Sequence, residues 1–145
     1  MRYQGESPDE ITLVDTAHRM GYTFINNGMG GRFINMFGCN QNIFIRQLQY
    51  FGFNSDRKRA SIIVEHNGLI KLMIKGADSF IIDRLSKDTP QPYLKEMEKE
   101  LVRFSKKGLR TLCMAERVLS PSEYKEVKDK MRQAMNSNDQ ESAVA

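Results

Sequence analysis

The 145-residue sequence contains no tryptophan and only two cysteines. Cys39 and Cys113 lie far apart and form no CxxC pair, which excludes a disulfide framework and a zinc ribbon. We expect both thiols to be reduced and structural in a cytosolic setting. No apolar run approaches the roughly 20 residues that a membrane-spanning helix needs, and the polar N-terminus does not resemble a signal peptide.

Several common catalytic motifs are also missing. The sequence has no GxSxG, no GxGxxG and no GxxxxGK[ST], so it indicates neither a serine-hydrolase elbow nor a Rossmann or Walker site. His18 and His66 stand alone and have no metal-ligand spacing with either cysteine. We therefore expect no metal site.

The overall composition is that of a folded domain. Hydrophobic residues make up 40% and charged residues 28% of the chain, which argues against wholesale disorder. The length predicts one domain over residues 1–135, followed by a frayed or disordered tail at 136–145. A net charge of +4 suits an anionic ligand but is too small by itself to indicate nucleic acid.

Helix signals stand at both ends of the sequence. Ser7-Pro8-Asp9-Glu10 combines an N-cap serine, a proline at the first helical position and a capping-box glutamate, which predicts a helix over 8–20. Ser120-Pro121-Ser122-Glu123 repeats the pattern and predicts a helix over 121–135. Apolar spacing and glycine stops predict two further helices, over 77–85 and 92–106.

The middle of the sequence is rich in β-branched and aromatic residues. Strands are expected between Tyr22 and Lys75, with a further strand over 109–118. Asn67-Gly68 between two apolar runs is the strongest short signal for a hairpin. Successive hairpins bounded by helices predict an α+β fold, in which an antiparallel sheet of about six strands is flanked by helices.

The hairpin register predicts where two distant residues lie. A two-residue turn at Asn67-Gly68 sets Ala60 opposite Lys75. If Asn54-Ser55-Asp56 is a tight connection, the strand that carries Phe53 ends where the next strand begins. We therefore expect Phe53 and Lys75 to lie at the same end of the sheet.

An aromatic ring beside a lysine is suited to a nucleotide, because the base can stack on the ring and the phosphates can bind the cation. Gly76 lets a ligand approach the backbone, and Lys75 opens a turn into a helix whose N–H groups attract anions. Two simpler interpretations remain open. Phe53 can be one more core aromatic, and Lys75 can merely end a strand.

Three further groups each allow two interpretations. Arg57-Lys58-Arg59 can attract phosphates, or it can be a solvated charge cluster on an edge strand. Glu10 can accept a hydrogen bond from an adenine amino group, although its place in a capping box explains it fully. Arg110, in Gly108-Leu109-Arg110-Thr111-Leu112, stands at the mouth of a predicted strand, where a surface arginine is common.

Four blocks of the sequence resemble the nucleotide-binding domain of type-IV P-type ATPases, the phospholipid flippases. They occur in the order and at the spacing of that family and cover nearly the whole chain. The blocks are Gln4-Gly5-Glu6-Ser7-Pro8-Asp9-Glu10 with Leu13-Val14, Phe53-Asn54-Ser55-Asp56-Arg57-Lys58-Arg59, Lys75-Gly76-Ala77-Asp78-Ser79, and Gly108-Leu109-Arg110-Thr111-Leu112.

The resemblance implies a role for each candidate residue. Phe53 would stack on the adenine ring of ATP, and Ser55 would be a polar contact beside it. Lys75, with Gly76, would line the pocket. Glu10 would lie near the adenine amino group, and Arg110 would reach toward the phosphates.

The resemblance also implies a larger protein. A complete pump needs a phosphorylated aspartate in Asp-Lys-Thr-Gly-Thr, a Mg²⁺-binding stretch and membrane helices, and this sequence has none of them. We therefore expect a monomeric cytosolic domain of an integral membrane protein, which binds ATP without turning it over. Its expected partners are the phosphorylation and actuator domains and an accessory subunit, with no nucleic acid. The alternative is a basic nucleic-acid-binding or protein-interaction module without nucleotide affinity.

Overall fold

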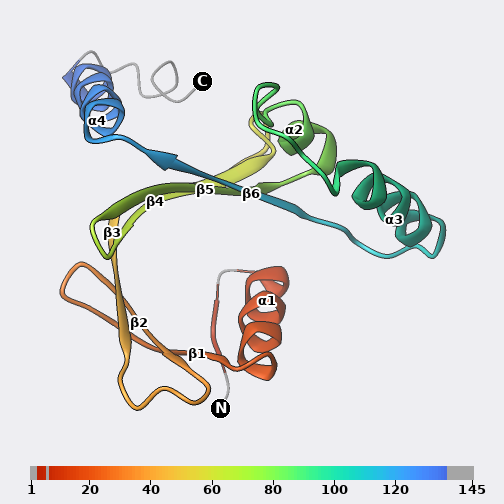
Figure 1. Cartoon of the computed structure of the whole chain (residues 1–145), viewed down its shortest axis with the longest axis horizontal. Helices are drawn as coiled ribbons and strands as arrows, with labels where there is room; N and C mark the ends of the chain where they lie inside the picture. Colours follow the sequence, from red (N-terminus) through yellow and green to blue (C-terminus); the bar gives the residue numbers. More distant parts are fainter. Residues whose placement is uncertain (1–2, 6, 137–145) are drawn as a thin grey trace. The chain divides into compact units, whose positions relative to one another are not determined.

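A computed structural model describes residues 3–5 and 7–136, which form six strands and four helices (Figure 1). In chain order the elements are α1 (Pro8–Arg19), β1 (Tyr22–Gly28), β2 (Gly31–Met36), β3 (Ile43–Asn54), β4 (Arg59–His66), β5 (Leu69–Gly76), α2 (Asp78–Ile82), α3 (Leu94–Lys106), β6 (Cys113–Leu119) and α4 (Pro121–Asn136). The strands form one open sheet in sequence order, β1-β2-β3-β4-β5-β6. The prediction of an antiparallel α+β fold is therefore confirmed.

The chain divides into two compact units. The first combines the residues up to Gln49 with Val64–Leu69, and the second combines Tyr50–Ile63 with the residues from Ile70 onward. In the first unit α1 contacts β1, and the rings of Phe33 and Phe44 lie 4.9 Å apart between their centroids. That 1–135 act as one nucleotide-binding domain stays a prediction.

The Asn67-Gly68 hairpin is confirmed. It joins β4 and β5 directly, and both turn residues have positive φ, 51° for Asn67 and 74° for Gly68. A turn with this backbone matches the twist of the flanking strands. At the other end of the hairpin the Ala77 backbone N–H donates to the Lys58 carbonyl at 3.2 Å, as the predicted pairing of Ala60 with Lys75 requires.

Both serine caps are also confirmed. The Ser7 side chain accepts from the Glu10 backbone N–H at the start of α1. At the start of α4 the Ser120 hydroxyl accepts from the Glu123 N–H, and the Glu123 carboxylate accepts from the Ser120 N–H at 2.7 Å. The capping pattern therefore located both helix starts. The helices α1, α2 and α3 are all shorter than predicted.

The predicted strand over 109–118 begins too early. Its first residue in the structure is Cys113, which pairs with Gly76 at the end of β5. Beyond Gly76 the chain leaves the sheet to form α2, so 109–112 have no β5 residue to pair with. The β-rich composition of this segment does not reveal where its partner strand ends.

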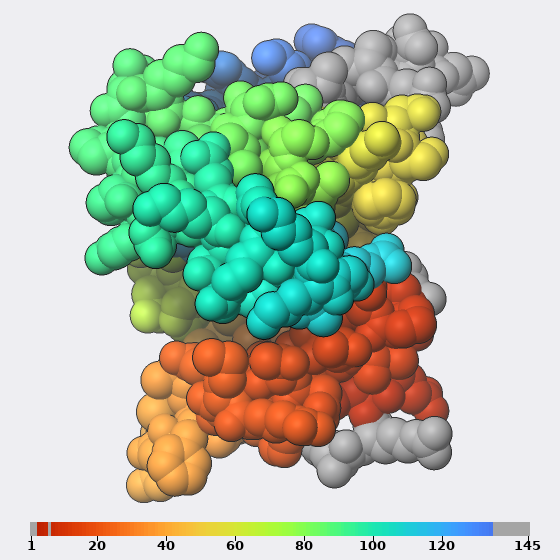
Figure 2. Space-filling view, turned by 90° about the vertical axis from the view of Figure 1, so that its right-hand side faces the viewer, coloured from red at the N-terminus to blue at the C-terminus, as the bar shows by residue number. Residues whose placement is uncertain are grey.

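The second unit holds most of the fully buried apolar side chains. Ile63 on β4 and Ile81 on α2 are 1% and 2% exposed, and Cys113 on β6 is also buried. α3 lies at the surface, where Figure 2 shows it in teal, and none of its residues is buried. The core therefore lies between the central strands and α2.

The two cysteines differ in burial. Both thiols are free, but only Cys113 is packed, since Cys39 is exposed. Burial raises the pKa of the Cys113 thiol, and the charge of Asp78 raises it further.

The predicted tail begins at the last residue of α4, because Asn136 ends that helix. Residues 137–145 lie outside the described residues. Within the described ranges no helix is long and apolar enough to span a membrane.

Candidate functional site

The connection between β3 and β4 is a tight turn. The Lys58 N–H donates to the Asn54 carbonyl at 2.7 Å, and the Asn54 side-chain oxygen accepts from the N–H groups of Asp56 and Arg57. Asparagine is favoured at such positions because its side chain satisfies the backbone of the turn. The turn therefore places the end of β3 beside the start of β4.

Phe53 lies next to this turn and is not a core residue. Its side chain is 68% exposed, which leaves a hydrophobic ring on the surface near the end of β3. Ser55, in the turn itself, is also exposed. The interpretation of Phe53 as one more core aromatic is therefore wrong, and its ring is accessible to a ligand.

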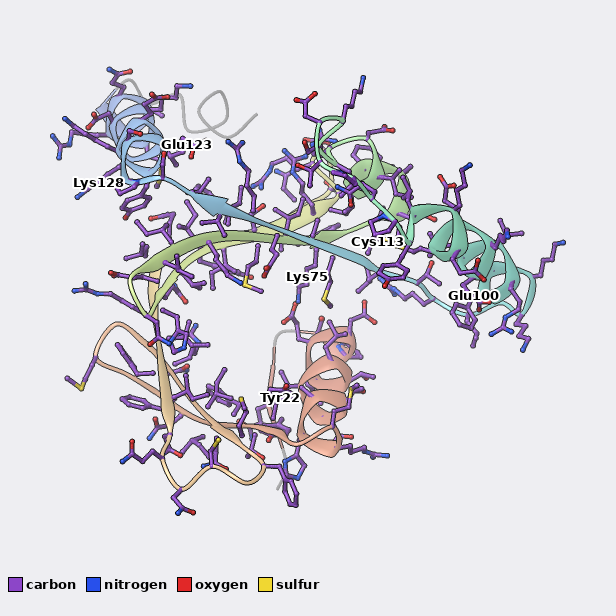
Figure 3. All side chains as sticks on the ribbon, in the orientation of Figure 1. Tyr22, Lys75, Glu100, Cys113, Glu123 and Lys128 are labelled. Carbon is purple, nitrogen blue, oxygen red and sulfur yellow. The ribbon has the colours of Figure 1, made fainter. Side chains whose placement is uncertain are left out.

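Lys75 lies near the end of β5, opposite Met114 of β6. Its side chain is half-buried. Figure 3 shows Lys75 extending from the sheet on the side away from α2. Because β4 lies between β3 and β5, Phe53 and Lys75 are carried by strands that end at the same end of the sheet.

Gly76 is buried against the start of β4. A Cβ there would lie 2.9 Å from the Arg59 Cα and closer still to the Lys58 carbonyl oxygen. The strands thus approach each other at a distance that only glycine permits. Position 76 therefore needs glycine because of the packing of β4 against β5.

The other two candidates do not lie on strands of the sheet. Arg110 belongs to the same unit and is exposed in the segment before β6. Glu10 belongs to the first unit, is half-buried in the first turn of α1, and uses its backbone N–H for the Ser7 cap.

The interpretation of Arg57-Lys58-Arg59 as a charge cluster on an edge strand is wrong. β4 is an internal strand between β3 and β5, and Arg59 is 8% exposed, whereas Lys58 is exposed. Burial lowers the pKa of the Arg59 guanidinium, and the charges of Arg84 and Arg57 lower it further. Sequence reasoning did not single out Arg84, because a lone arginine after a short helix carries no signal.

One hollow of about 390 Å³ lies elsewhere, within the first unit. It is open, and the Arg46–Glu65 ion pair and the turn residues Asn67 and Gly68 contribute to its lining. It contains no predicted site residue. Among the described residues no cluster of three or more His, Cys, Asp or Glu could hold a metal ion.

Comparison with known proteins identifies the family. Residues 2–143 match the model of the family described as P-type ATPase, cytoplasmic domain N. The chain is 43% identical over 127 residues to the phospholipid-transporting ATPase DNF1 of Chaetomium thermophilum, covering 87% of this chain and 8% of that protein. It is 36% identical over 133 residues to the phospholipid-transporting ATPase IC of Xenopus tropicalis, covering 91% and 10% respectively.

A plant relative gives the same result. The chain is 38% identical over 125 residues to the probable phospholipid-transporting ATPase 7 of Arabidopsis thaliana, covering 84% of this chain and 10% of that protein. The chain thus spans a tenth or less of these relatives. The match to the domain model covers almost the whole sequence, including the strand end that carries Phe53 and Lys75. The chain therefore belongs to the family of P-type ATPase cytoplasmic N domains.

Proposed function

We propose that this chain binds ATP at the end of the sheet, with the adenine ring stacked on Phe53 and Lys75 in contact with the nucleotide. The observation that carries the proposal is the 68% exposure of the Phe53 ring on the strand that neighbours β4. An exposed aromatic ring offers a base a stacking surface without any rearrangement of the core. Membership of the N-domain family supports the same ligand.

The proposed contacts predict weak binding. Stacking contributes roughly 1–3 kcal/mol per base, and a charge-assisted hydrogen bond contributes about 1.5–3 kcal/mol. Two or three such contacts, less the cost of ordering the ligand, correspond to a Kd on the order of 0.1 mM to several mM.

Secondary contacts complete the proposed site. Ser55 supplies a polar group beside the ring, and Arg110 contacts the phosphates from the segment before β6. Gly76 keeps the ends of β4 and β5 close together. Glu10 lies in the first unit, and its contact with the adenine amino group stays an expectation of the family resemblance.

The chain acts within a longer protein in this proposal. It presents ATP to an aspartate outside these residues, and phosphorylation of that aspartate drives phospholipid transport across a membrane. Mg²⁺ would bind with the phosphates and the phosphorylation domain, outside this chain. The phosphorylation and actuator domains are the proposed partners on the cytosolic side, and an accessory subunit joins the complete protein.

The test is the affinity for ATP of Phe53→Ala. Removing the stacking surface should weaken binding about tenfold, which corresponds to 1.4 kcal/mol. The matched control is Phe37→Ala, because Phe37 is a 91% exposed phenylalanine of the first unit. Isothermal titration calorimetry should give an unchanged Kd for the control.

Two results would contradict the proposal. If folded Phe53→Ala and Phe37→Ala bind ATP equally well, adenine does not stack on Phe53. If the chain does not bind ATP but binds oligonucleotides with a steep salt dependence, it is a nucleic-acid-binding module instead.

A further inference from the structure

Four cations gather around the start of β4 and the end of α2. They are Arg57, Lys58, Arg59 and Arg84. Within the part of the chain that the structure describes, no carboxylate forms an ion pair with any of them. Positive charges packed together without a counterion repel one another, and a bound anion would relieve that repulsion.

Arg59 is the buried member of the group. Its side chain is 8% exposed, and its one hydrogen bond runs from Nη1 to the Arg57 carbonyl at 3.1 Å. A guanidinium carries five N–H donors, so most of its capacity is unused. Its remaining donors are therefore available to an anion.

Arg57 and Arg84 lie near Arg59, and each has guanidinium N–H donors that no group among the described residues accepts. Arg57 donates from Nη2 to the Ser61 hydroxyl at 3.3 Å and lies over the Phe51 ring, while its buried Nε has no partner. Arg84 donates from Nη1 to the Phe80 carbonyl at 2.9 Å and is otherwise exposed. Both guanidinium groups are thus held in place by neutral partners, which leaves their charges uncompensated.

Arg59, the buried member of the cluster, and Lys75 point to different faces of the sheet. A Cβ on Gly76 would meet Arg59, so Gly76 and Arg59 share a face, and Lys75, one residue earlier, points to the other. Arg84 follows α2, and Figure 3 shows Lys75 on the side away from that helix. Arg59 therefore points away from the face on which Lys75 is proposed to contact the nucleotide.

We propose that Arg57, Arg59 and Arg84 form a binding site for a phosphate-type oxyanion on the α2 side of the sheet. Planar guanidinium groups bind phosphate oxygens in pairs of parallel hydrogen bonds, and three of them supply more donors than one phosphate group can use. Lys58, whose ammonium lies 5.3 Å from the centre of the Phe80 ring, adds long-range attraction at the exposed rim. This site does not rest on the proposed nucleotide function.

The probe is pyrophosphate, titrated into this chain at constant ionic strength. Binding is followed by calorimetry and by the Arg Nε–Hε signals in NMR spectra. We expect saturable binding that shifts the Arg59 signal, and Arg84→Gln should weaken it about tenfold. Arg132→Gln is the matched control, because it removes the same charge from an exposed position on α4.

Equal pyrophosphate affinities for Arg84→Gln and Arg132→Gln would overturn the site. So would the absence of a saturable shift at Arg59. Thermal melting without ligand confirms that Arg84→Gln is folded, and Arg57→Gln provides a second variant that should weaken binding in the same way.

Competition with ATP and the Phe53→Ala variant identify the source of the phosphate. If saturating ATP displaces pyrophosphate, the oxyanion is the tail of the nucleotide, and the site is supported as its phosphate subsite. If pyrophosphate binds equally well with ATP present, the site is supported as one for a separate phosphate ligand. Phe53→Ala should leave pyrophosphate binding unchanged, so a failure of adenine stacking is distinguished from a failure of the oxyanion site.

Discussion

At the scale of single residues, Gly76 shows how a sequence block can reflect packing as well as ligand binding. The glycine allows β4 and β5 to approach closely where one strand starts and the other ends. It thereby fixes the spacing between Lys75 and the turn after Phe53. The sequence indicates that a small residue is needed, but only the structure shows that backbone atoms fill the space.

Gly76→Ala tests this packing role. The added Cβ would lie 2.9 Å from the Arg59 Cα, so the strands must shift, and we expect a loss of about 1–3 kcal/mol in the free energy of unfolding. Gly52→Ala is the control, since its Cβ would be 3.8 Å from the Tyr50 ring. Urea denaturation should show a loss for Gly76→Ala alone. Equal stabilities would refute the packing role.

Lys75→Ala tests the charge proposed for the nucleotide site. We predict about a tenfold weaker Kd for ATP, because a charge-assisted contact is lost, and an unchanged Kd for adenosine. Lys71→Ala removes the same charge from the same strand, where Lys71 pairs with Glu116, and should not affect ATP. Weakened adenosine binding would instead assign Lys75 to the base.

Arg59 shows where prediction at this scale fails. In a charge run all three residues have similar sequence signals, and the strand period alone does not say which one points inward. The structure buries Arg59 and exposes Lys58. The exposure of Phe53 also depends on the tertiary fold, because its sequence context is that of any strand aromatic.

At the scale of elements, features that depend on neighbouring residues can be predicted from the sequence, whereas strand boundaries that depend on long-range pairing cannot. The Ser7 and Ser120 caps and the Asn67-Gly68 turn depend on contacts within a few residues, so their chemistry can be read from the sequence. The start of β6 depends on where β5 ends, which is a contact between distant segments. That boundary was therefore four residues early.

The cap of α4 predicts a pH-dependent stability. Hydrogen bonds from the Ser120 N–H and hydroxyl lower the pKa of Glu123, and Arg117 lowers it further. Because the folded pKa lies below the unfolded one, the cap stabilises the chain above the unfolded value of about 4.3. This contribution is lost as the pH falls through the folded pKa.

Glu123→Gln should therefore lower the Tm at pH 7, and the Tm values of wild type and variant should converge as the pH falls below about 4. Glu126→Gln removes the same charge one turn later on α4 and should not reproduce this pattern. The measurement is thermal melting across a pH series. A difference in Tm that is independent of pH would show that the carboxylate charge is not what the cap uses.

At the scale of the whole molecule, the candidate residues are divided between the two units. Phe53, Ser55, Lys75 and Arg110 belong to the second unit, and Glu10 belongs to the first. All five candidates lie in the four sequence blocks that resemble the family. Which side chains of a unit lie close together depends on its tertiary packing, which local patterns do not encode.

The most direct measurement of the central claim is a titration of the isotope-labelled chain with ATP, followed by ¹⁵N–¹H correlation spectra. We predict that the largest shifts of backbone amide signals are concentrated at Phe53, Ser55 and Lys75. Saturation should occur on the order of 0.1 mM to several mM ATP. Shifts confined to the hairpin tip near Asn67, or no saturable shift at all, would contradict the account.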